Sequence, residues 1–392
     1  MRILHVVPTY LPAWRHGGPI FAIHGLAKAL VARGHEVSVF TTNVHAHEDL
    51  EVPLARPVDL DGVAVRYFPT RLSRRLYRSP TMAAALAQEM PRQDVAHLHS
   101  LFLWPPAAAG RAARLARVPY LVAPRGMLVQ DLIRQRGRWR KRLWLAAVDR
   151  PLLERAAGLH VTSELEAAEA RRFGWHLPEL FVVPNGIDLA ELEDRPDAAL
   201  SPAVDELVRL GPFFLCLGRI SWKKGLDRVI AALAELGDGT LVLAGNDEEG
   251  LAPALSRQAQ SLGVAHRLRL PGPVSGADKA ALLARCAALV LPSLSENFGN
   301  VVLEAMGAGR PVVLSPEVGL ASEVLQARAG LVVPADSSTL ARALRGLLAD
   351  PDQAAQMGRR GAELVRRRFT WAAVAEQMEK VYQEVQRRAG SR

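Results

Sequence analysis

The sequence predicts an α/β protein with two similar domains, each built on a parallel β-sheet, that face each other across a cleft. The chain has 392 residues, of which 49% are hydrophobic and 23% charged, as is typical of a globular protein large enough for two domains. One pattern of strand, glycine-bearing loop, helix and strand occurs twice along the chain. A pattern repeated at domain length indicates two Rossmann-like domains.

The first copy of the pattern occupies the N-terminal region. Gly17 and Gly18 lie in a loop where glycine permits close approach of the backbone to a ligand, although an ordinary loop before a helix has the same composition. Pro19 suits the first helical position, where no backbone N–H is needed. The elements are expected at residues 3–7 (strand), 20–33 (helix) and 36–41 (strand).

Three more strands are expected in the first half, at residues 94–99, 120–123 and 158–161. The last leads to Ser163, and Glu166 follows three residues later, which is the spacing of a helix capping box. We place the hinge in the acidic, proline-bearing stretch that follows residues 182–188. The predicted division is therefore a first domain at 1–190, a second at 191–370, and a helical segment at 371–392 that packs back on the first domain.

The second copy of the pattern begins with an apolar strand at 213–217, and its helix and second strand are expected at 226–236 and 240–244. Its loop contains Arg219 and Lys224, which suit a diphosphate because arginine donates a bidentate fork and lysine a point charge. The loop matches neither a Walker motif nor a GxGxxG motif. A solvated basic loop is the alternative interpretation.

The most informative stretch is 292–311, where Glu296 and Glu304 stand on either side of a Phe298-Gly299 turn. A strand, a glycine turn and a helix present free N–H groups to a phosphate. Carboxylates repel a phosphate, so we expect the two glutamates to accept hydrogen bonds from neutral hydroxyl groups. A helix-dipole role would explain Glu304 alone, but not Glu296. A ligand with a diphosphate between two hydroxylated rings, such as a nucleotide-sugar, fits this layout.

The first domain offers further site candidates where its strands end. His97 and His99 lie on one face of a strand that should be buried, and we favour a site role for His99 and a structural role for His97. Arg125 follows the next strand and is a candidate for contact with an acceptor. Asn185 precedes Gly186 in a turn signal that alone indicates no more than a turn.

The net charge of +9 favours anionic partners. Much of it lies in segment 132–145, which is rich in arginine and contains Trp139 and Trp144. Such a segment suits an anionic membrane surface, while a solvated helix face is the alternative. No nucleic-acid-binding module is recognised, so no nucleic acid is expected.

Other features limit the class of protein. No apolar run approaches the length of a membrane span, and the N-terminus starts with a strand rather than a signal-peptide pattern, so we expect a cytoplasmic protein or one peripheral on the inner face of the cytoplasmic membrane. Cys216 and Cys286 are expected to be small buried side chains. No metal site and no cofactor are expected, because no histidine, cysteine and carboxylate cluster is visible and Asp59-Leu-Asp61 falls in a predicted loop outside the site.

These motifs resemble the retaining glycosyltransferases of family four, which have the GT-B architecture. The resemblance covers nearly the whole chain, and its specific signals are the Gly218–Gly225 loop and, roughly 75 residues on, Glu296 and Glu304 followed by residues 305–311. The resemblance implies transfer of a sugar from a nucleotide-diphosphate sugar with retention of configuration, usually without a metal. Asn297 and Asn300 depart from the residues that many members have there, which points to a particular donor sugar.

The resemblance also implies roles for individual residues. Arg219 and Lys224 would bind the donor diphosphate, and Glu304 the nucleotide ribose. Glu296 and the backbone of Phe298, Gly299, Asn300 and Val301 would bind the transferred sugar and phosphate. Backbone near Val274 would meet the base, Gly17 and Gly18 would close over the phosphates, and His99 would face sugar or acceptor. The predicted catalytic set is His99, Arg219, Lys224 and Glu296, and the predicted acceptor contacts are His99, Arg125 and Asn185.

The leading hypothesis is a retaining glycosyltransferase that builds a lipid-linked or cell-surface glycan at the cytoplasmic membrane face. A transferase of the same fold with a soluble acceptor, a nucleotide-sugar epimerase and a non-catalytic binding protein are the alternatives. An epimerase would form product from donor alone, and a binding protein would bind polyanions in a salt-sensitive way but no nucleotide-sugar.

Overall fold

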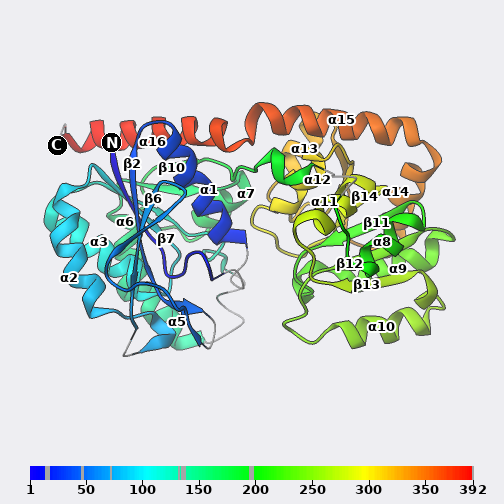
Figure 1. The fold of residues 1–392 in the computed structure, drawn as a ribbon, viewed down its shortest axis with the longest axis horizontal. Coiled ribbons are helices and arrows are strands. Elements are labelled where there is room, and N and C mark those ends of the chain that lie inside the picture. Colours follow the sequence, from blue (N-terminus) through cyan, green and yellow to red (C-terminus); the bar gives the residue numbers. More distant parts are fainter. Residues whose placement is uncertain are drawn as a thin grey trace. The chain divides into compact units, whose positions relative to one another are not determined.

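The computed structural model describes residues 1–13, 18–45, 48–70, 73–130, 133, 138–193 and 198–390. The chain forms two compact units: Met1–Gly186 together with Trp371–Arg392, and Ile187–Thr370 (Figure 1). The boundary thus falls four residues before the predicted division, and the C-terminal segment belongs with the first unit.

The first unit contains an eight-stranded sheet in the order β10-β9-β8-β7-β1-β2-β6-β5. All neighbours are parallel except β5, which runs antiparallel to β6. β5 covers residues predicted as a loop with Asp59, so that part of the prediction was wrong. The strands are β1 (Arg2–Val6), β2 (Glu36–Thr42), β5 (Pro57–Leu60), β6 (Val63–Phe68), β7 (Val95–His99), β8 (Tyr120–Ala123), β9 (Gly158–Val161) and β10 (Leu180–Val182), and a separate antiparallel pair joins β3 (Val44–His45) to β4 (Glu48–Asp49).

Helices connect these strands and cover the sheet. α1 begins at Gly18, two residues earlier than predicted, so Gly18 is helical rather than part of the loop. A π-helical turn at Leu145–Asp149 joins two of the helices. The helices of this unit are α1 (Gly18–Ala32), α2 (Pro80–Glu89), α3 (Trp104–Ala116), α5 (Arg138–Trp144), α6 (Arg150–Glu154), α7 (Glu164–Arg171) and α16 (Trp371–Gly390).

The C-terminal helix α16 is part of the core of the first unit and lies beside α1 (Figure 1). Its buried residues Met378 and Tyr382 pack in one cluster with Ile3 of β1. The Trp371 ring covers Gly186, where an added Cβ would lie 2.6 Å from a ring carbon. Gly186 is therefore needed because the Trp371 ring packs against it, and not only because the chain turns there.

The second unit contains a six-stranded parallel sheet in the order β13-β12-β11-β14-β15-β16. Numbered along the unit, this is the order 3-2-1-4-5-6 of a Rossmann sheet. Its strands are β11 (Phe213–Leu217), β12 (Thr240–Ala244), β13 (Leu268–Gly272), β14 (Ala288–Leu291), β15 (Val312–Leu314) and β16 (Gly330–Val332), and its helices are α8 (Pro202–Arg209), α9 (Leu226–Leu236), α10 (Ala252–Ser261), α11 (Gly276–Arg285), α12 (Asn300–Gly307), α13 (Ala321–Ala327), α14 (Ser337–Ala349) and α15 (Pro351–Arg368).

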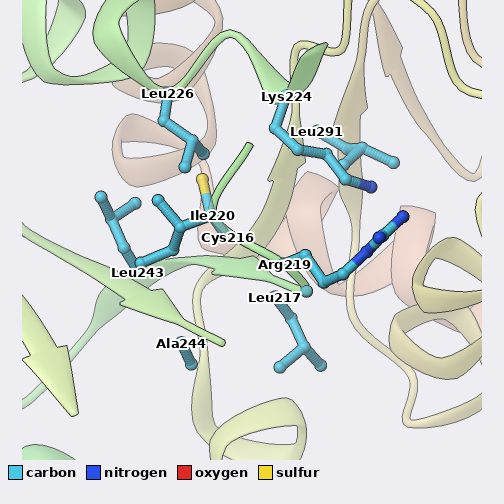
Figure 2. Close-up of a pocket in the computed structure, with 10 residues that line it drawn as sticks. Cys216, Leu217, Arg219, Ile220, Lys224, Leu226, Leu243, Ala244 and Leu291 are labelled. Carbon is cyan, nitrogen blue, oxygen red and sulfur yellow. The ribbon is translucent and has the colours of Figure 1, made fainter. Parts of the chain in front are cut away.

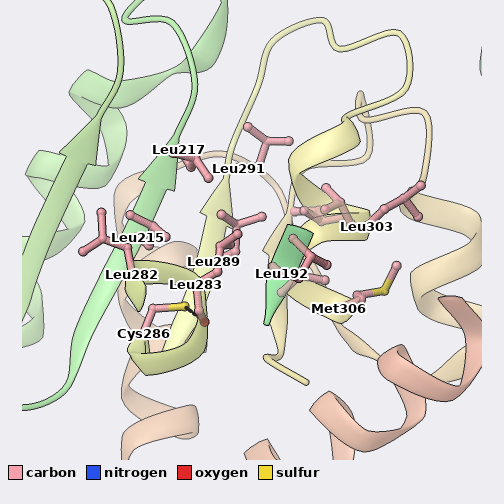
Figure 3. Close-up of a cluster of buried hydrophobic side chains, with 14 of the residues drawn as sticks. Leu192, Leu215, Leu217, Leu282, Leu283, Cys286, Leu289, Leu291, Leu303 and Met306 are labelled. Atoms are coloured by element: carbon pink, nitrogen blue, oxygen red, sulfur yellow. Dashed lines mark hydrogen bonds between the residues drawn. The ribbon is translucent and has the colours of Figure 1, made fainter. Parts of the chain in front are cut away.

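Both faces of this sheet are buried, as the continuous apolar strands predict. Leu215 and Leu217 point into one hydrophobic cluster, while Phe214 and Cys216 point into another on the opposite face. Figure 3 shows the first cluster, where Leu289 packs beside Leu215. Burial of one such leucine contributes about 1.5–3 kcal/mol, so the core holds the strand ends at fixed positions.

Each of the two sheets has a topological switch point, where the strand order reverses and connections leave toward opposite edges of the sheet. In the first unit it lies between β1 and β7, and in the second between β11 and β14. Ligands of open α/β sheets bind outside the carboxyl ends of the strands at such a point. The two predicted Rossmann-like domains are confirmed, and the switch points indicate where to look for a site in each unit.

Candidate functional site

The predicted diphosphate loop leaves the sheet at the switch point of the second unit. Gly218 follows β11, and a 3₁₀ turn at Trp222–Lys224 ends at Gly225, whose φ of 61° is left-handed. An added Cβ at Gly225 would overlap the carbonyl oxygen of Pro292, which follows β14. The N–H of Leu294 donates to the carbonyl of Lys223 at 2.7 Å. The two loops predicted to form the site are therefore bound to each other.

Lys224 and Glu296 meet between these loops. The Lys224 ammonium group donates to the Glu296 carboxylate, and both side chains are about one-fifth exposed. The backbone of Glu296 is fixed by two hydrogen bonds. Its N–H donates to the carbonyl of Glu317 at 3.0 Å, and its carbonyl accepts from the N–H of Gly319 at 2.9 Å. Two of the predicted catalytic residues are thus an ion pair on a rigid support.

Arg219 lies at the edge of the same site. Its side chain is 67% exposed and Nη1 is 3.6 Å from the Glu248 carboxylate, a weak partner in water. Figure 2 shows the nitrogen ends of Arg219 and Lys224 turned toward the same side of a pocket that Cys216, Leu217 and Gly218 also line. Both cations are therefore placed to approach one anion.

The second carboxylate, Glu304, lies in α12. Its Oε1 is 3.0 Å from the ammonium group of Lys279 on α11. Gly299, with a φ of 91°, is the N-cap of α12, and Asn300 is its first residue, so the N-terminus of this helix lies beside the Glu296 loop. Each predicted glutamate is therefore held by a lysine from another element.

The remaining predicted donor residues offer mainly backbone. Phe298 is buried in the core, and the side chains of Val301 and Val274 pack against the same cluster. Asn297 lies in the same loop, one residue after Glu296. Gly17 lies outside the described residues, whereas Gly18 opens α1.

Sequence reasoning missed three residues of this region. Gly245 follows β12, and an added Cβ would overlap the carbonyl oxygen of Gly218, so the strand ends can approach only because residue 245 is glycine. Glu249 accepts from Ser221 Oγ at 2.9 Å and from the N–H of Trp222 at 3.2 Å, which fixes the basic loop. Lys279 has no sequence signal because its partner is 25 positions away on a different helix.

The first unit places a buried cluster of four histidines at the carboxyl end of its sheet. His5 of β1, His97 and His99 of β7 and His160 of β9 have no more than 2% exposure. His160 Nε2 donates to the carbonyl of Val183 at 2.8 Å, and its Nδ1 lies 3.2 Å from His97 Nε2. His97 Nδ1 lies 2.8 Å from the hydroxyl of Tyr382 on α16. His97 has the structural setting expected of it, because it joins the sheet to the C-terminal helix.

His99 is engaged on both ring nitrogens. Arg125 Nε and Nη2 each lie 3.4 Å from His99 Nδ1, and His99 Nε2 lies 3.0 Å from His5 Nδ1. Because arginine only donates, His99 Nδ1 is the acceptor, Nε2 carries the proton, and His5 Nδ1 accepts it. His99 was expected to face sugar or acceptor directly, whereas here it is fully buried behind Arg125.

Burial keeps these imidazoles neutral. Desolvation, and secondarily the Arg125 charge, lowers the pKa of His5 to about 3. Burial lowers the pKa of His99 well below its usual value, again with help from Arg125. One nitrogen from each of His5, His97 and His99 lies within 4.8 Å of the others, which suits a metal ion. His5 Nε2 is buried with no hydrogen-bond partner among the described residues, but the other ring nitrogens of these three histidines are hydrogen-bonded and the adjacent Arg125 charge repels a cation.

The basic segment is described only in part, since Leu132 and residues 134–137 lie outside the described residues. In α5, Trp139 is 68% exposed and Leu143 61%, and they lie one helical turn apart. The Arg140 guanidinium lies 5.1 Å from the Trp139 ring centre. No helix in the described part of the chain combines the length and apolar character needed to cross a bilayer.

Asp149 connects this segment to the loop after His99. Its carboxylate accepts from the N–H of Phe102 at 3.0 Å and from Trp144 Nε1 at 3.3 Å. Burial raises the pKa of Asp149 to about 7, and these two hydrogen bonds oppose the shift.

Two family models match the chain. The glycosyl transferase 4-like domain matches residues 17–186, and glycosyl transferases group 1 matches residues 206–364. A glycogen synthase from Mycobacterium tuberculosis is 30% identical and covers 97% of this chain and 94% of its own length. A phosphatidyl-myo-inositol mannosyltransferase from Mycobacterium leprae is 30% identical, over 94% of this chain and 93% of its own.

Solved structures have the same fold. Sucrose-phosphate synthase from Thermosynechococcus elongatus has a TM-score of 0.77 at 24% identity and covers 98% of both chains. HepE from Anabaena, solved in complex with UDP, has a TM-score of 0.76 at 20% identity and covers 98% of this chain and 100% of its own.

Proposed function

Because the chain belongs to the glycosyl transferases group 1 family and is a glycosyltransferase of the GT-B type, we propose that it transfers a sugar from a nucleotide-diphosphate sugar with retention of configuration. The acceptor in this proposal is a lipid-linked or cell-surface polysaccharide precursor at the cytoplasmic face of the membrane. The observation that supports the donor most directly is the meeting of Lys224 and Glu296 at the switch point of the second sheet.

The proposed reaction uses positive charge where the leaving group forms. The bond between the sugar carbon and the diphosphate oxygen breaks, and a bond to the acceptor oxygen forms on the same face. The acceptor proton passes to the departing phosphate. Lys224, Arg219 and the first N–H groups of α12 stabilise the charge on the diphosphate, and each such donor contributes about 3 kcal/mol by analogy with oxyanion holes. These groups supply positive charge without a metal ion.

In this proposal, the glutamates of the two lysine–glutamate pairs accept hydrogen bonds from the hydroxyl groups of the donor. A diphosphate that approaches Lys224 competes with Glu296 for the ammonium group, which frees a carboxylate oxygen to accept a hydrogen bond from the sugar. Glu304 accepts hydrogen bonds from the ribose while Lys279 holds its other side.

The membrane part of the proposal rests on α5. Its exposed Trp139 and Leu143 lie among arginines and lysine, and segment 132–145 has no acidic residue. Aromatic and basic side chains together favour the headgroup region of an anionic bilayer. The similarity to the Mycobacterium leprae phosphatidyl-myo-inositol mannosyltransferase supports a lipid acceptor.

A second candidate function is transfer to a soluble acceptor. The similarity to the Mycobacterium tuberculosis glycogen synthase favours this candidate. Flotation with vesicles of anionic lipid separates the two candidates, since the soluble-acceptor enzyme would stay at the bottom of the gradient.

A donor screen tests the proposed function. Purified protein would be incubated with UDP-, GDP- and ADP-sugars, with and without bacterial lipid extract and EDTA, and nucleotide release followed. We expect release from one donor, raised by lipid and unchanged by EDTA, and loss of release in Arg219→Ala but not in Arg209→Ala, an exposed control paired with Asp205. Absence of release from every donor would overturn the proposal.

A further inference from the structure

Arg125 is a partly buried guanidinium group in the first unit whose hydrogen-bond partners all lack charge. Nη1 donates to Asn185 Oδ1 at 3.0 Å, and Nε and Nη2 share the neutral His99 Nδ1 at 3.4 Å. A guanidinium group has five N–H donors, so hydrogens on Nη1 and Nη2 remain for another acceptor. Among the described residues, none places a carboxylate in a salt bridge with it.

The nearest acid already has its own hydrogen-bond partners. Glu166 accepts from the N–H of Gly126 at 2.7 Å, from the N–H of Thr162 at 2.7 Å and from Thr162 Oγ1 at 2.9 Å. These bonds fix the loop that carries Arg125, and no carboxylate in the described part of the chain pairs directly with its guanidinium group. Burial accordingly lowers the pKa of Arg125 to about 10, and the more distant Glu166 charge only partly opposes this shift.

The backbone around Arg125 is held in a conformation that few side chains adopt. Arg125 has a φ of 54° and Gly126 a φ of 74°, both left-handed, directly after β8. Left-handed conformations of residues other than glycine raise the free energy and concentrate at ligand sites. The structure therefore keeps a positive charge at one position near the carboxyl end of the sheet, where ligands of such sheets bind.

A charge removed from water is normally paired, and among the described residues the partly buried Arg125 has only neutral hydrogen-bond partners. We propose that Arg125 is the centre of an anion subsite of the first unit that binds a phosphate or carboxylate group of the substrate. Nη1 and Nη2 donate to two oxygens of the anion, while Asn185 and the His5–His99 pair position the guanidinium. His5 and His99 act through Arg125 and are positioning residues.

The subsite deepens the proposed transferase function by naming a chemical class of substrate, and it rests on that function only for the source of the anion. The anionic group belongs to the acceptor, close to the hydroxyl that receives the sugar.

The test uses the full chain and inorganic phosphate as the probe. Side-chain ¹H–¹⁵N spectra assign the imidazole of His99, whose Nδ1 accepts from Arg125, and phosphate is titrated into the wild type, Arg125→Gln, Arg125→Lys and Arg117→Gln. Arg117 is a matched control because it is exposed and also has a left-handed φ, of 57°. We expect phosphate to shift the His99 signal in the wild type and the control, and Arg125→Gln to weaken that binding roughly tenfold to a hundredfold.

Arg125→Lys keeps the charge without the fork and should bind with intermediate affinity. Unchanged phosphate binding in Arg125→Gln, or a His99 signal that phosphate never moves, would overturn the subsite. Repeating the titration with saturating UDP tests the assignment to the acceptor, because an acceptor subsite would still bind phosphate, whereas phosphate binding that UDP abolishes would contradict it. If UDP itself failed to bind, the proposed transferase site would be wrong while the phosphate result would still decide the subsite.

Discussion

The two units differ in how the cationic side chains near the carboxyl ends of their sheets are partnered. In the second unit, Lys224 lies against Glu296 and Lys279 against Glu304, and all four side chains are partly exposed. In the first unit, Arg125 lies among neutral histidines and Asn185. The lysine and glutamate charges of the second site compensate one another, whereas no described residue places a carboxylate in a salt bridge with Arg125. This difference suggests that the proposed donor site can form with its charges already paired, while the first-unit site retains a positive charge that can attract an anion.

The largest effect is expected from breaking the balanced site. Lys224→Ala removes a cation from the developing diphosphate charge and leaves Glu296 without its partner, so turnover should fall by about 10²–10³. Lys380→Ala, which breaks a surface ion pair with Glu376, is the control. Steady-state kinetics with the donor found in the screen measures this, and equal turnover in the two variants would remove Lys224 from the mechanism.

A glycine substitution tests whether the support of the donor site depends on close packing. Gly245→Ala introduces a methyl group against the carbonyl oxygen of Gly218 and should lower the free energy of unfolding by about 1–3 kcal/mol. Gly346→Ala, in α14, meets nothing within 4 Å and should raise it by about 0.4–1 kcal/mol. Urea denaturation gives both values, and similar effects in the two variants would mean that the strand ends can separate freely.

Acid should distinguish the first unit from the second. Burial lowers the pKa of His5 and of His160 to about 3, so between pH 6.5 and 3 the unfolded chain binds protons that the folded chain does not. Each such histidine lowers stability by about 1.4 kcal/mol per pH unit as the pH falls. Asp149, with a pKa raised to about 7, has the opposite slope between its unfolded pKa and pH 7, but the histidines outnumber it.

Urea midpoints at pH 7 and pH 5 check this expectation. Fluorescence and amide exchange should report earlier unfolding of the first unit at pH 5. Equal loss of stability in both units would show that the histidine cluster does not set the acid response.

The smallest effect on stability is expected at the membrane segment. Trp139→Ala with Leu143→Ala removes exposed apolar groups and should change the free energy of unfolding by less than about 0.5 kcal/mol. The same pair should abolish flotation with anionic vesicles, whereas Leu115→Ala, an exposed residue of α3, should not. Flotation that survives the double substitution would place membrane contact elsewhere or remove it from the account.

Much of the fold follows from local patterns. The predicted strands at 120–123, 158–161, 213–217 and 240–244 agree with β8, β9, β11 and β12 at both ends, because parallel strands buried on both faces appear as short apolar runs. β5 was missed because an antiparallel edge strand of four residues with Pro57 lacks that run.

The proposed donor site was easier to predict than the first-unit site, because its residues form local patterns in the sequence. Arg219, Lys224, Glu296 and Glu304 lie in two short segments whose glycines and spacing are visible in the sequence. The setting of Arg125 depends on residues far away in the sequence. His99 and Asn185, which contact Arg125, are 26 and 60 positions away from it, and Glu166 is 40 positions from Gly126, which it contacts. Half of the predicted capping box is confirmed, because Ser163 Oγ accepts from the N–H of Glu166 at 3.1 Å. The Glu166 carboxylate reaches Gly126 and Thr162, and its contact with Gly126 is one that only the folded sheet creates.

Equilibrium binding of UDP, GDP and ADP tests the central claim, that the second unit holds a nucleotide-diphosphate at its switch point. Calorimetry would compare the wild type with Lys224→Ala and Glu304→Ala. The account predicts that one nucleotide binds the wild type and that each variant weakens binding at least about tenfold, since each removes a charged contact. Equal affinity in all three proteins, or no binding by the wild type, would contradict it.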